Sequence, residues 1–177
     1  MAQPGRQPST NGVVPRVCHV SLEYSIPGVN YSASVGGLFK VVDLFIRKFP
    51  FPLSLIVPRL ADFPLPSLPP AEPAKQGWVT VLGAWVPVHV HVLRDVAPCG
   101  APRTFYLLTC RVFSKRTAKD LYECASASAE MVLYSAWSQA VAHAADVIAP
   151  NADVIHLHDY HGEGKGDAEG EGERVEV

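Results

Sequence analysis

The amino-acid sequence predicts an α/β fold built on a largely parallel sheet. Short apolar runs of strand length alternate along the chain with segments of helical periodicity. Two mostly apolar runs, at residues 17–22 and 53–57, have the length and composition of buried parallel strands. Polar turns follow two of the predicted elements, at residues 36–37 and 158–161, where ligands bind in sheets of this class.

The first strand is predicted at residues 17–22, and a long loop is predicted at residues 23–35. Gly36 and Gly37 then open a helix that continues through residues 38–48. Basic residues near its end suit a helix C-terminus, and the prolines that follow end it. Its apolar side chains recur at helical spacing: Leu38, Val41, Val42, Phe45 and Ile46.

The middle of the chain is predicted to add strands and one irregular crossing. Residues 53–57 form the second strand. The proline-rich residues 64–73 form an extended surface loop, because proline cannot donate to a central strand. Residues 78–82 and 86–92 both alternate between apolar and polar, and residues 83–84 between them indicate a hairpin.

The last part of the predicted domain contains a strand, a long helix and another strand. The strands are predicted at residues 104–109 and 153–158, and the helix at residues 120–148. Asp120 and Glu123 would then lie at the helix N-terminus, where the helix dipole favours acidic side chains.

The ends of the chain differ in composition from its body. Residues 1–15 are predicted to be a flexible lead-in, and residues 16–162 form one partial domain. Residues 163–177 are rich in glycine and glutamate and are predicted to be disordered. We expect that the globular sequence stops at residue 162 before its fold is complete.

Composition excludes several classes of function. The net charge of −2 gives no basis for binding nucleic acid or an anionic membrane. No apolar run is long enough to span a membrane, and no secretory signal is visible, so a cytoplasmic chain is expected. The cysteines match no metal or redox spacing and are predicted to be reduced thiols: Cys18, Cys99, Cys110 and Cys124.

The paired glycines Gly36 and Gly37 are the first candidate for chemistry. A ligand can approach a glycine backbone closely, and the new helix presents unpaired N–H groups suited to phosphate. The segment matches neither the dinucleotide-binding motif GxGxxG nor a P-loop. A plain loop-to-helix turn is the alternative interpretation.

The second candidate is the polar segment after the last strand, which contains His156, His158, Asp159, Tyr160 and His161. Its imidazoles and carboxylate suggest metal ligation, although the spacing departs from the metallo-hydrolase pattern HxHxDH. Hydrogen-bonded histidines at a strand end, without metal, are the favoured interpretation. A sugar or phosphate contact by His161 is a third.

Other polar residues are less informative. His89 and His91 share one strand face, and a solvated face explains them both. Glu23 lies just past the first strand, where it could contact a ligand or orient the long loop. No GxSxG nucleophile motif is present.

Taken in order, several motifs resemble the N-terminal part of starch and glycogen synthases, and more closely the synthase domain of fungal cell-wall α-1,3-glucan synthases. Residues 22–27 resemble the LEYDIP motif of that family. Residues 134–139 resemble its YSAWNQ motif, and residues 159–162 its NDYHG motif. The segments at 35–38 and 56–59 also match in order and spacing.

This resemblance implies a Rossmann-like, incomplete N-terminal domain of a GT-B glycosyltransferase. Such a hexosyltransferase passes glucose from UDP-glucose or ADP-glucose to an α-glucan acceptor with retention of configuration, without another cofactor. By this analogy, Gly36 and Gly37 would lie against the donor phosphates. His161 would contact the donor glucose near the reacting carbon as the catalytic residue, and Glu23 would shape the acceptor side. Substrate-binding roles also fall on two neighbours of His161: Asp159 and Tyr160.

Two departures from the family pattern matter. The family usually carries Lys-x-Gly-Gly-Leu, and here Ser34 replaces the lysine that neutralises the diphosphate. The C-terminal donor-binding domain is not present, so we expect no transfer activity from this chain alone. The resemblance also implies that the full-length family member lies in the plasma membrane, with its synthase domain on the cytosolic side. A metal-dependent hydrolase and a non-catalytic glucan-binding module are the alternative functions.

Overall fold

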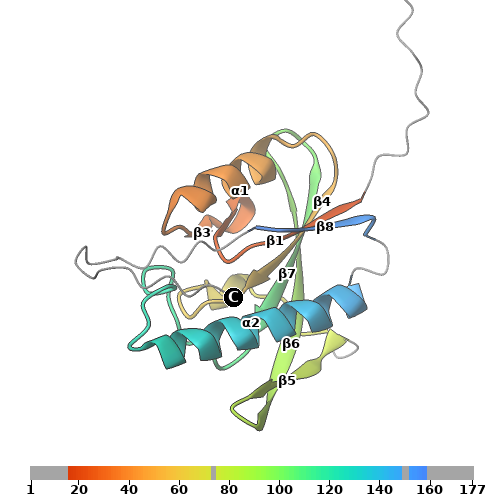
Figure 1. The fold of residues 1–177 in the computed structure, drawn as a ribbon. Helices are drawn as coiled ribbons and strands as arrows, with labels where there is room; N and C mark the ends of the chain where they lie inside the picture. The colour runs from red at the N-terminus through yellow and green to blue at the C-terminus, as the bar shows by residue number, and fades with distance from the viewer. Residues whose placement is uncertain (1–15, 73–74, 149–151, 159–177) are drawn as a thin grey trace, which may run out of the picture.

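A computed structural model describes residues 16–72, 75–148 and 152–158. It confirms a mixed α/β fold (Figure 1). One six-stranded sheet has the strand order β5-β6-β7-β4-β1-β8, and helices α1 and α2 cover opposite faces of its parallel part (Figure 1). The predicted termini, 1–15 and 163–177, lie outside the described residues.

Four strands of the sheet are parallel and two are antiparallel additions. The pairs β7–β4, β4–β1 and β1–β8 run parallel, whereas β5–β6 and β6–β7 run antiparallel. The predicted strands are therefore found, with these bounds: β1 Val17–Val20, β4 Leu53–Pro58, β5 Gly77–Val81, β6 Ala84–Val96, β7 Pro102–Thr109 and β8 Val154–Leu157.

The apolar residues of the central strands form the core. Leu55, Ile56 and Val57 of β4 are fully buried, as expected for a strand covered on both faces. Along β6, the alternating Val86, Val88 and Val90 are buried, which confirms the predicted apolar face of the hairpin. The hairpin turns at Leu82 and Gly83, which both have positive φ, as a two-residue type I′ turn requires.

The predicted loop at residues 23–35 is wrong in one respect, because it contains a small antiparallel hairpin. Strand β2, Tyr24–Ile26, pairs with β3, Tyr31–Ala33, across the 3₁₀ turn Pro27–Val29. Asn30 ends that turn in the left-handed conformation. Strands of three residues are too short to show periodicity in the sequence, so the prediction missed them.

Helix α1, Gly37–Lys48, is found where it was predicted. Its C-terminal end is fixed by Arg103 of β7, whose side chain is only 1% exposed. The guanidinium group donates to the carbonyl oxygens of Ile46, Phe49 and Phe51 at 2.6–2.9 Å. These bonds satisfy acceptors that a helix end leaves without intrahelical partners.

The long helix begins later than predicted. Helix α2 spans Ala127–Ile148, so the prediction of a start at residue 120 is wrong. Asp120 instead accepts the side-chain hydroxyl and the N–H of Thr117, and Arg116 donates to the carbonyl oxygens of Asp120 and Glu123. These bonds hold residues 111–126 as successive turns. The Ser126 hydroxyl then caps α2 by accepting the N–H of Ala129.

The predictions about the cysteines and about membrane-spanning segments can be compared with the fold. Four free cysteines are found, of which Cys18 and Cys110 are buried. Neither α1 nor α2 is long and apolar enough to cross a bilayer.

Candidate functional site

The carboxyl ends of β1 and β8 meet at one edge of the sheet. The chain leaves β1 through α1 to reach β4 on one side, and it reaches β8 on the other side through α2. The strand order thus reverses at β1, which is where open α/β sheets bind ligands. The N–H of His158, just past β8, donates to the carbonyl oxygen of Val20 at 3.0 Å, which fixes this edge.

Glu23 lies at this edge and holds the diglycine turn. Its side chain is only 3% exposed, and its Oε2 accepts N–H groups of Val35, Gly36 and Phe39 at 2.9–3.2 Å. Its Oε1 accepts the hydroxyl of Tyr122 at 3.0 Å. A carboxylate at a helix N-terminus is stabilised by the helix dipole and by these donors.

Some N–H groups of the diglycine turn are hydrogen-bonded to Glu23, and others are not. Glu23 occupies those of Val35, Gly36 and Phe39, so a negative charge is already present beside Gly36. No acceptor is found for the N–H groups of Gly37 and Leu38 within the part of the chain that the structure describes. A methyl group added at Gly37 would meet no atom within 4 Å, so its outer side is open.

A cavity of about 530 Å³ lies beside the same edge, between β1, β8 and α2. Its walls are mostly apolar, with hydroxyl groups on the side of Ser21 and Ser138. Leu38, from the first turn of α1, and His158, from the end of β8, both line it. The first turn of α1, directly after the diglycine pair, and the end of β8 therefore border one hollow. Tyr122, Tyr134 and Trp137 also contribute to its wall.

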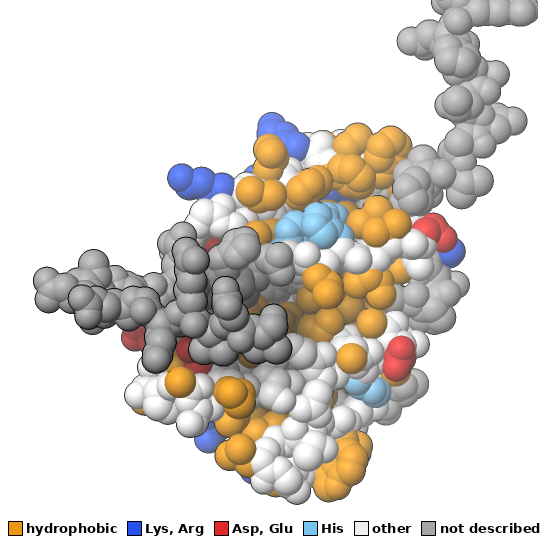
Figure 2. Space-filling view, viewed as in Figure 1, with side chains coloured by type: hydrophobic (Ala, Val, Ile, Leu, Met, Phe, Trp, Pro, Cys, Tyr) orange, Lys and Arg blue, Asp and Glu red, His pale blue; other side chains and the backbone are white. Residues whose placement is uncertain are grey.

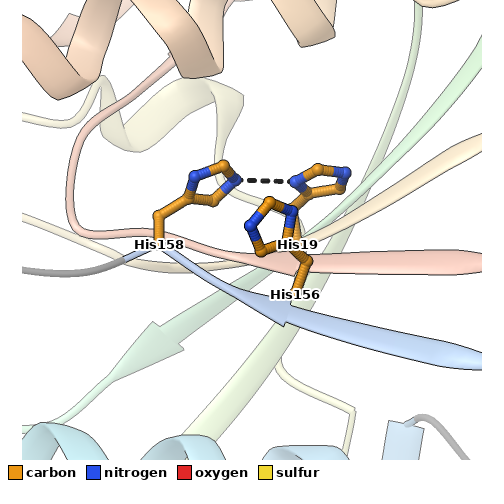
Figure 3. Close-up of side chains that lie close together, drawn as sticks. All are labelled: His19, His156 and His158. Carbon is orange, nitrogen blue, oxygen red and sulfur yellow. Dashed lines mark hydrogen bonds between the residues drawn. The ribbon is translucent and has the colours of Figure 1, made fainter.

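Three histidines cluster on the α1 side of the same two strands (Figure 3). His19 of β1 lies directly opposite His156 of β8, and His158 lies two residues farther along the same face. The Nδ1 of His19 and the Nε2 of His158 are 2.7 Å apart. The rings of His156 and His158 stack with centroids 4.3 Å apart.

Burial and the neighbouring imidazoles favour the neutral form of His19 and of His158. His19 is only 4% exposed, and desolvation together with the nearby His158 and His156 lowers its pKa to about 4. Desolvation first, and then His156, also lower the pKa of His158. At neutral pH, both rings are therefore uncharged, and across the 2.7 Å contact one ring donates its N–H to the nitrogen lone pair of the other.

The structure brings some of the predicted site residues together. Glu23 binds the turn that contains Gly36 and Gly37, and His158 lines the same cavity as Leu38, the residue after this turn. The predicted residues His161, Asp159 and Tyr160 lie outside the described residues. Glu23 was predicted either to contact a ligand or to orient the long loop, and its hydrogen bonds to Val35, Gly36 and Phe39 orient the end of that loop.

Sequence reasoning missed His19 and Tyr122. His19 was treated only as part of a strand, because the sequence does not say which strand pairs with which. His156 and His158 are two residues apart in a predicted strand, so they share one face, and a neighbouring parallel strand can place a third residue beside them. No sequence signal connects Tyr122 to Glu23, which lies 99 residues away.

His89 and His91 of β6 lie in a different environment from the three-histidine cluster. The ring Nδ1 of His91 is 2.7 Å from the carbonyl oxygen of Pro69, in the proline-rich loop. His91 is thus a half-buried residue that contacts this loop. His89 is also half-buried, and neither belongs to the three-histidine cluster.

Comparison with known proteins gives relatives of one kind. The chain is 31% identical over 146 residues to the cell wall α-1,3-glucan synthase mok13 of Schizosaccharomyces pombe. It is 25% identical over 146 residues to mok11, which has the same description and organism. The sequence is similar to cell wall α-1,3-glucan synthases. The match covers 80% of this chain but spans only 6% of the length of either relative.

No protein-family model and no solved structure matches the chain. The similarity to the α-1,3-glucan synthases agrees with the resemblance seen in the motifs. Three of those segments contribute to the site just described, and the one at residues 35–38 supplies the diglycine turn and Leu38. The segment at residues 22–27 supplies Glu23, and the segment at residues 134–139 lines the cavity through Tyr134 and Trp137.

Proposed function

We propose that this chain supplies part of the donor site of an α-glucan synthase, which transfers glucose from a nucleotide sugar to a growing α-glucan. The observation that carries the proposal is that Leu38, which directly follows the diglycine turn, and His158, at the end of β8, line one hollow. This hollow lies at the point where the strand order reverses. The similarity to cell wall α-1,3-glucan synthases supports the choice of reaction.

In this proposal, the donor diphosphate lies against the outer side of the α1 N-terminus. Gly37 and Leu38 offer it their N–H groups, and the positive end of the helix dipole attracts it. Glu23 acts as a positioning residue, because its carboxylate fixes the turn from inside. Its charge opposes a second anion, so the diphosphate must stay on the Gly37 side of the turn.

The finer assignments are part of the proposal. The domain is the Rossmann-like N-terminal half of a GT-B enzyme, and His161 contacts the donor glucose near the reacting carbon, with Asp159 and Tyr160 beside it. Hydrogen-bond donors at that place would stabilise charge that develops in the transition state. The synthase domain would work in the cytosol of a membrane-tethered protein.

Calorimetric titration of the chain with UDP-glucose and ADP-glucose tests the proposal. We expect binding to one of them, and weaker binding by Gly37→Ala, because the added methyl group would occupy the space that the phosphate approaches. This variant should fold normally, since the space around Gly37 is open. Unchanged donor affinity in Gly37→Ala would overturn the placement.

Ser34→Lys provides the opposite test. Ser34 is exposed, so a lysine is accommodated there without repacking. It would restore the cation of the family motif, and we expect it to tighten donor binding by about tenfold, the size of one partly screened charge contact on a phosphate. Ser32→Lys, on the exposed side of β3, is the matched control and should change affinity little.

Two further measurements separate the alternatives. Titration with maltooligosaccharides would reveal a glucan-binding module if the sugars bind and nucleotide sugars do not. An assay for glucose transfer should show no turnover by this chain alone, because the proposed second half of the site lies in another domain. Turnover by the isolated chain would contradict the division of the site between two domains.

A further inference from the structure

We propose that His19, His156 and His158 form a binding site for a divalent transition-metal ion, with Zn²⁺ as the best-suited ion. The proposal rests on the convergence of three imidazoles at one point of the sheet (Figure 3). It concerns the α1 face of β1 and β8 and does not rest on the proposed function, although His158 also lines the hollow described above.

The distances between the ligand atoms fit one ion. One ring nitrogen from each histidine lies within 4.8 Å of the other two. Three nitrogens bound to a tetrahedral Zn²⁺ at its usual bond length are about 3.3 Å apart. The nitrogens of His19 and His158, now 2.7 Å apart, must therefore separate by about 0.6 Å. Metal binding therefore requires side-chain rotations, which must also bring the His156 nitrogen, now within 4.8 Å of the other two, to the same spacing.

The backbone fixes two of the ligands relative to the third. His19 and His156 are paired residues of neighbouring parallel strands, and His158 shares the face of His156 because side chains alternate along a strand. Ligands on strands of a sheet are held more precisely than ligands on loops. The ring of His19 also packs on Phe45 of α1, with centroids 5.1 Å apart.

The chemistry of the donors selects the ion. Three imidazole nitrogens suit Zn²⁺, Ni²⁺ or Cu²⁺, whereas Mg²⁺ and Ca²⁺ require oxygen ligands. His19 is buried and His156 is exposed, so an ion can enter from solvent and retain a water ligand on the outer side. Figure 2 shows histidine side chains at the surface below α1.

An ion at this site would attach β8 to the rest of the sheet. Strand β8 is an edge strand, and all four of its residues are exposed. It is joined to the sheet by its pairing with β1. A metal bound by one histidine of β1 and two of β8 stabilises this pairing, because the ion binds only when the strands are together.

The test is calorimetric titration of the untagged, metal-free chain with ZnCl₂ near neutral pH. We expect one ion per chain with a dissociation constant at or below about 1 µM. His156→Ala should weaken binding by at least about 100-fold, because loss of a direct ligand costs more than the 10–100-fold loss seen for outer-shell partners. His156 is exposed, so this variant should fold. His89→Ala, which lies outside the cluster, is the matched control and should bind like the parent chain.

Two further measurements identify the ligands. His19→Phe keeps an aromatic ring against Phe45 and should also lose binding, whereas His161→Ala should retain it. Co²⁺ should give the strong visible absorption of tetrahedral coordination, and the absorption should disappear in His156→Ala. The proposal is refuted if Zn²⁺ binds weakly or not at all, or if His89→Ala weakens binding as much as His156→Ala. Binding that depends on His161 but not on His19 would also refute it.

Discussion

Replacement of Glu23 tests how the diglycine turn is held in place. Glu23 accepts four hydrogen bonds, from the N–H groups of Val35, Gly36 and Phe39 and from the Tyr122 hydroxyl. In Glu23→Ala these four donors lose their acceptor. Val35 and Gly36 are exposed, so water can replace the carboxylate there at little cost.

Phe39 and Tyr122 are half-buried, and their donors determine the cost. An unsatisfied buried donor costs roughly 1–3 kcal/mol, and a half-buried one lies in the lower part of that range, so the two together give about 2–4 kcal/mol. Loss of the charge at the helix N-terminus adds about 0.5 kcal/mol. We therefore expect Glu23→Ala to lower the free energy of unfolding by about 3–4 kcal/mol. Glu23→Gln keeps an acceptor for the N–H groups and should cost only about 1 kcal/mol.

The free energies come from urea denaturation followed by far-ultraviolet circular dichroism. Glu130→Gln is the control, because Glu130 lies in the first turn of α2 and is half-buried. It should change stability by about 0.5 kcal/mol at most. The reasoning is refuted if Glu23→Ala lies within about 1 kcal/mol of the parent chain. It also fails if the alanine and glutamine variants are equally stable, because the hydrogen bonds would then contribute nothing beyond the charge.

Four other predictions concern parts of the fold away from the diglycine turn. Arg103→Met leaves the carbonyl oxygens at the end of α1 without donors and should cost about 2–4 kcal/mol in urea denaturation; a cost below about 1 kcal/mol would contradict its assigned role. Burial raises the pKa of the Cys110 thiol, so the folded state keeps its proton after the unfolded state has lost it. Stability should therefore fall as the pH rises through the ordinary thiol range near 9, more than in Cys110→Ala. At mildly alkaline pH, the exposed Cys99 should react with a thiol reagent well before Cys110, and equal rates would contradict the burial. Ser126→Ala removes the cap of α2 and should cost about 1 kcal/mol, whereas Ser126→Asp should restore most of it; an alanine variant as stable as the parent would show that the cap is unimportant.

The parts of the fold with strong periodicity could be predicted from the sequence. Helix α1 was correctly placed because its apolar residues repeat at helical spacing and Pro50 and Pro52 follow it. The start of α2 was not, because it depends on bonds between Arg116, Asp120 and Thr117 that a periodic pattern does not encode. Tertiary hydrogen bonds there outweighed the good helical composition.

The candidate site was predicted in a similar, partial way. Motif order brought Gly36 and Glu23 to attention, and the structure adds that the carboxylate of Glu23 holds the turn. The strand order could not be read from one sequence. The meeting of His19 with His156 and His158 therefore depended on a pairing between residues about 140 positions apart along the chain, which sequence spacing does not reveal.

Helix α1 is anchored at both ends by a side chain from another element, Glu23 at its start and Arg103 at its finish. Each anchor carries the charge that complements its end of the helix dipole. Both ends of the helix are therefore fixed in the folded protein. A ligand that binds at Gly37 meets N–H donors that are already ordered, so binding does not lose conformational entropy in ordering them. Loss of the Arg103 hydrogen bonds, roughly 16 Å away along the helix axis, would then lower the affinity for a ligand at Gly37, although no residue that contacts the ligand is changed.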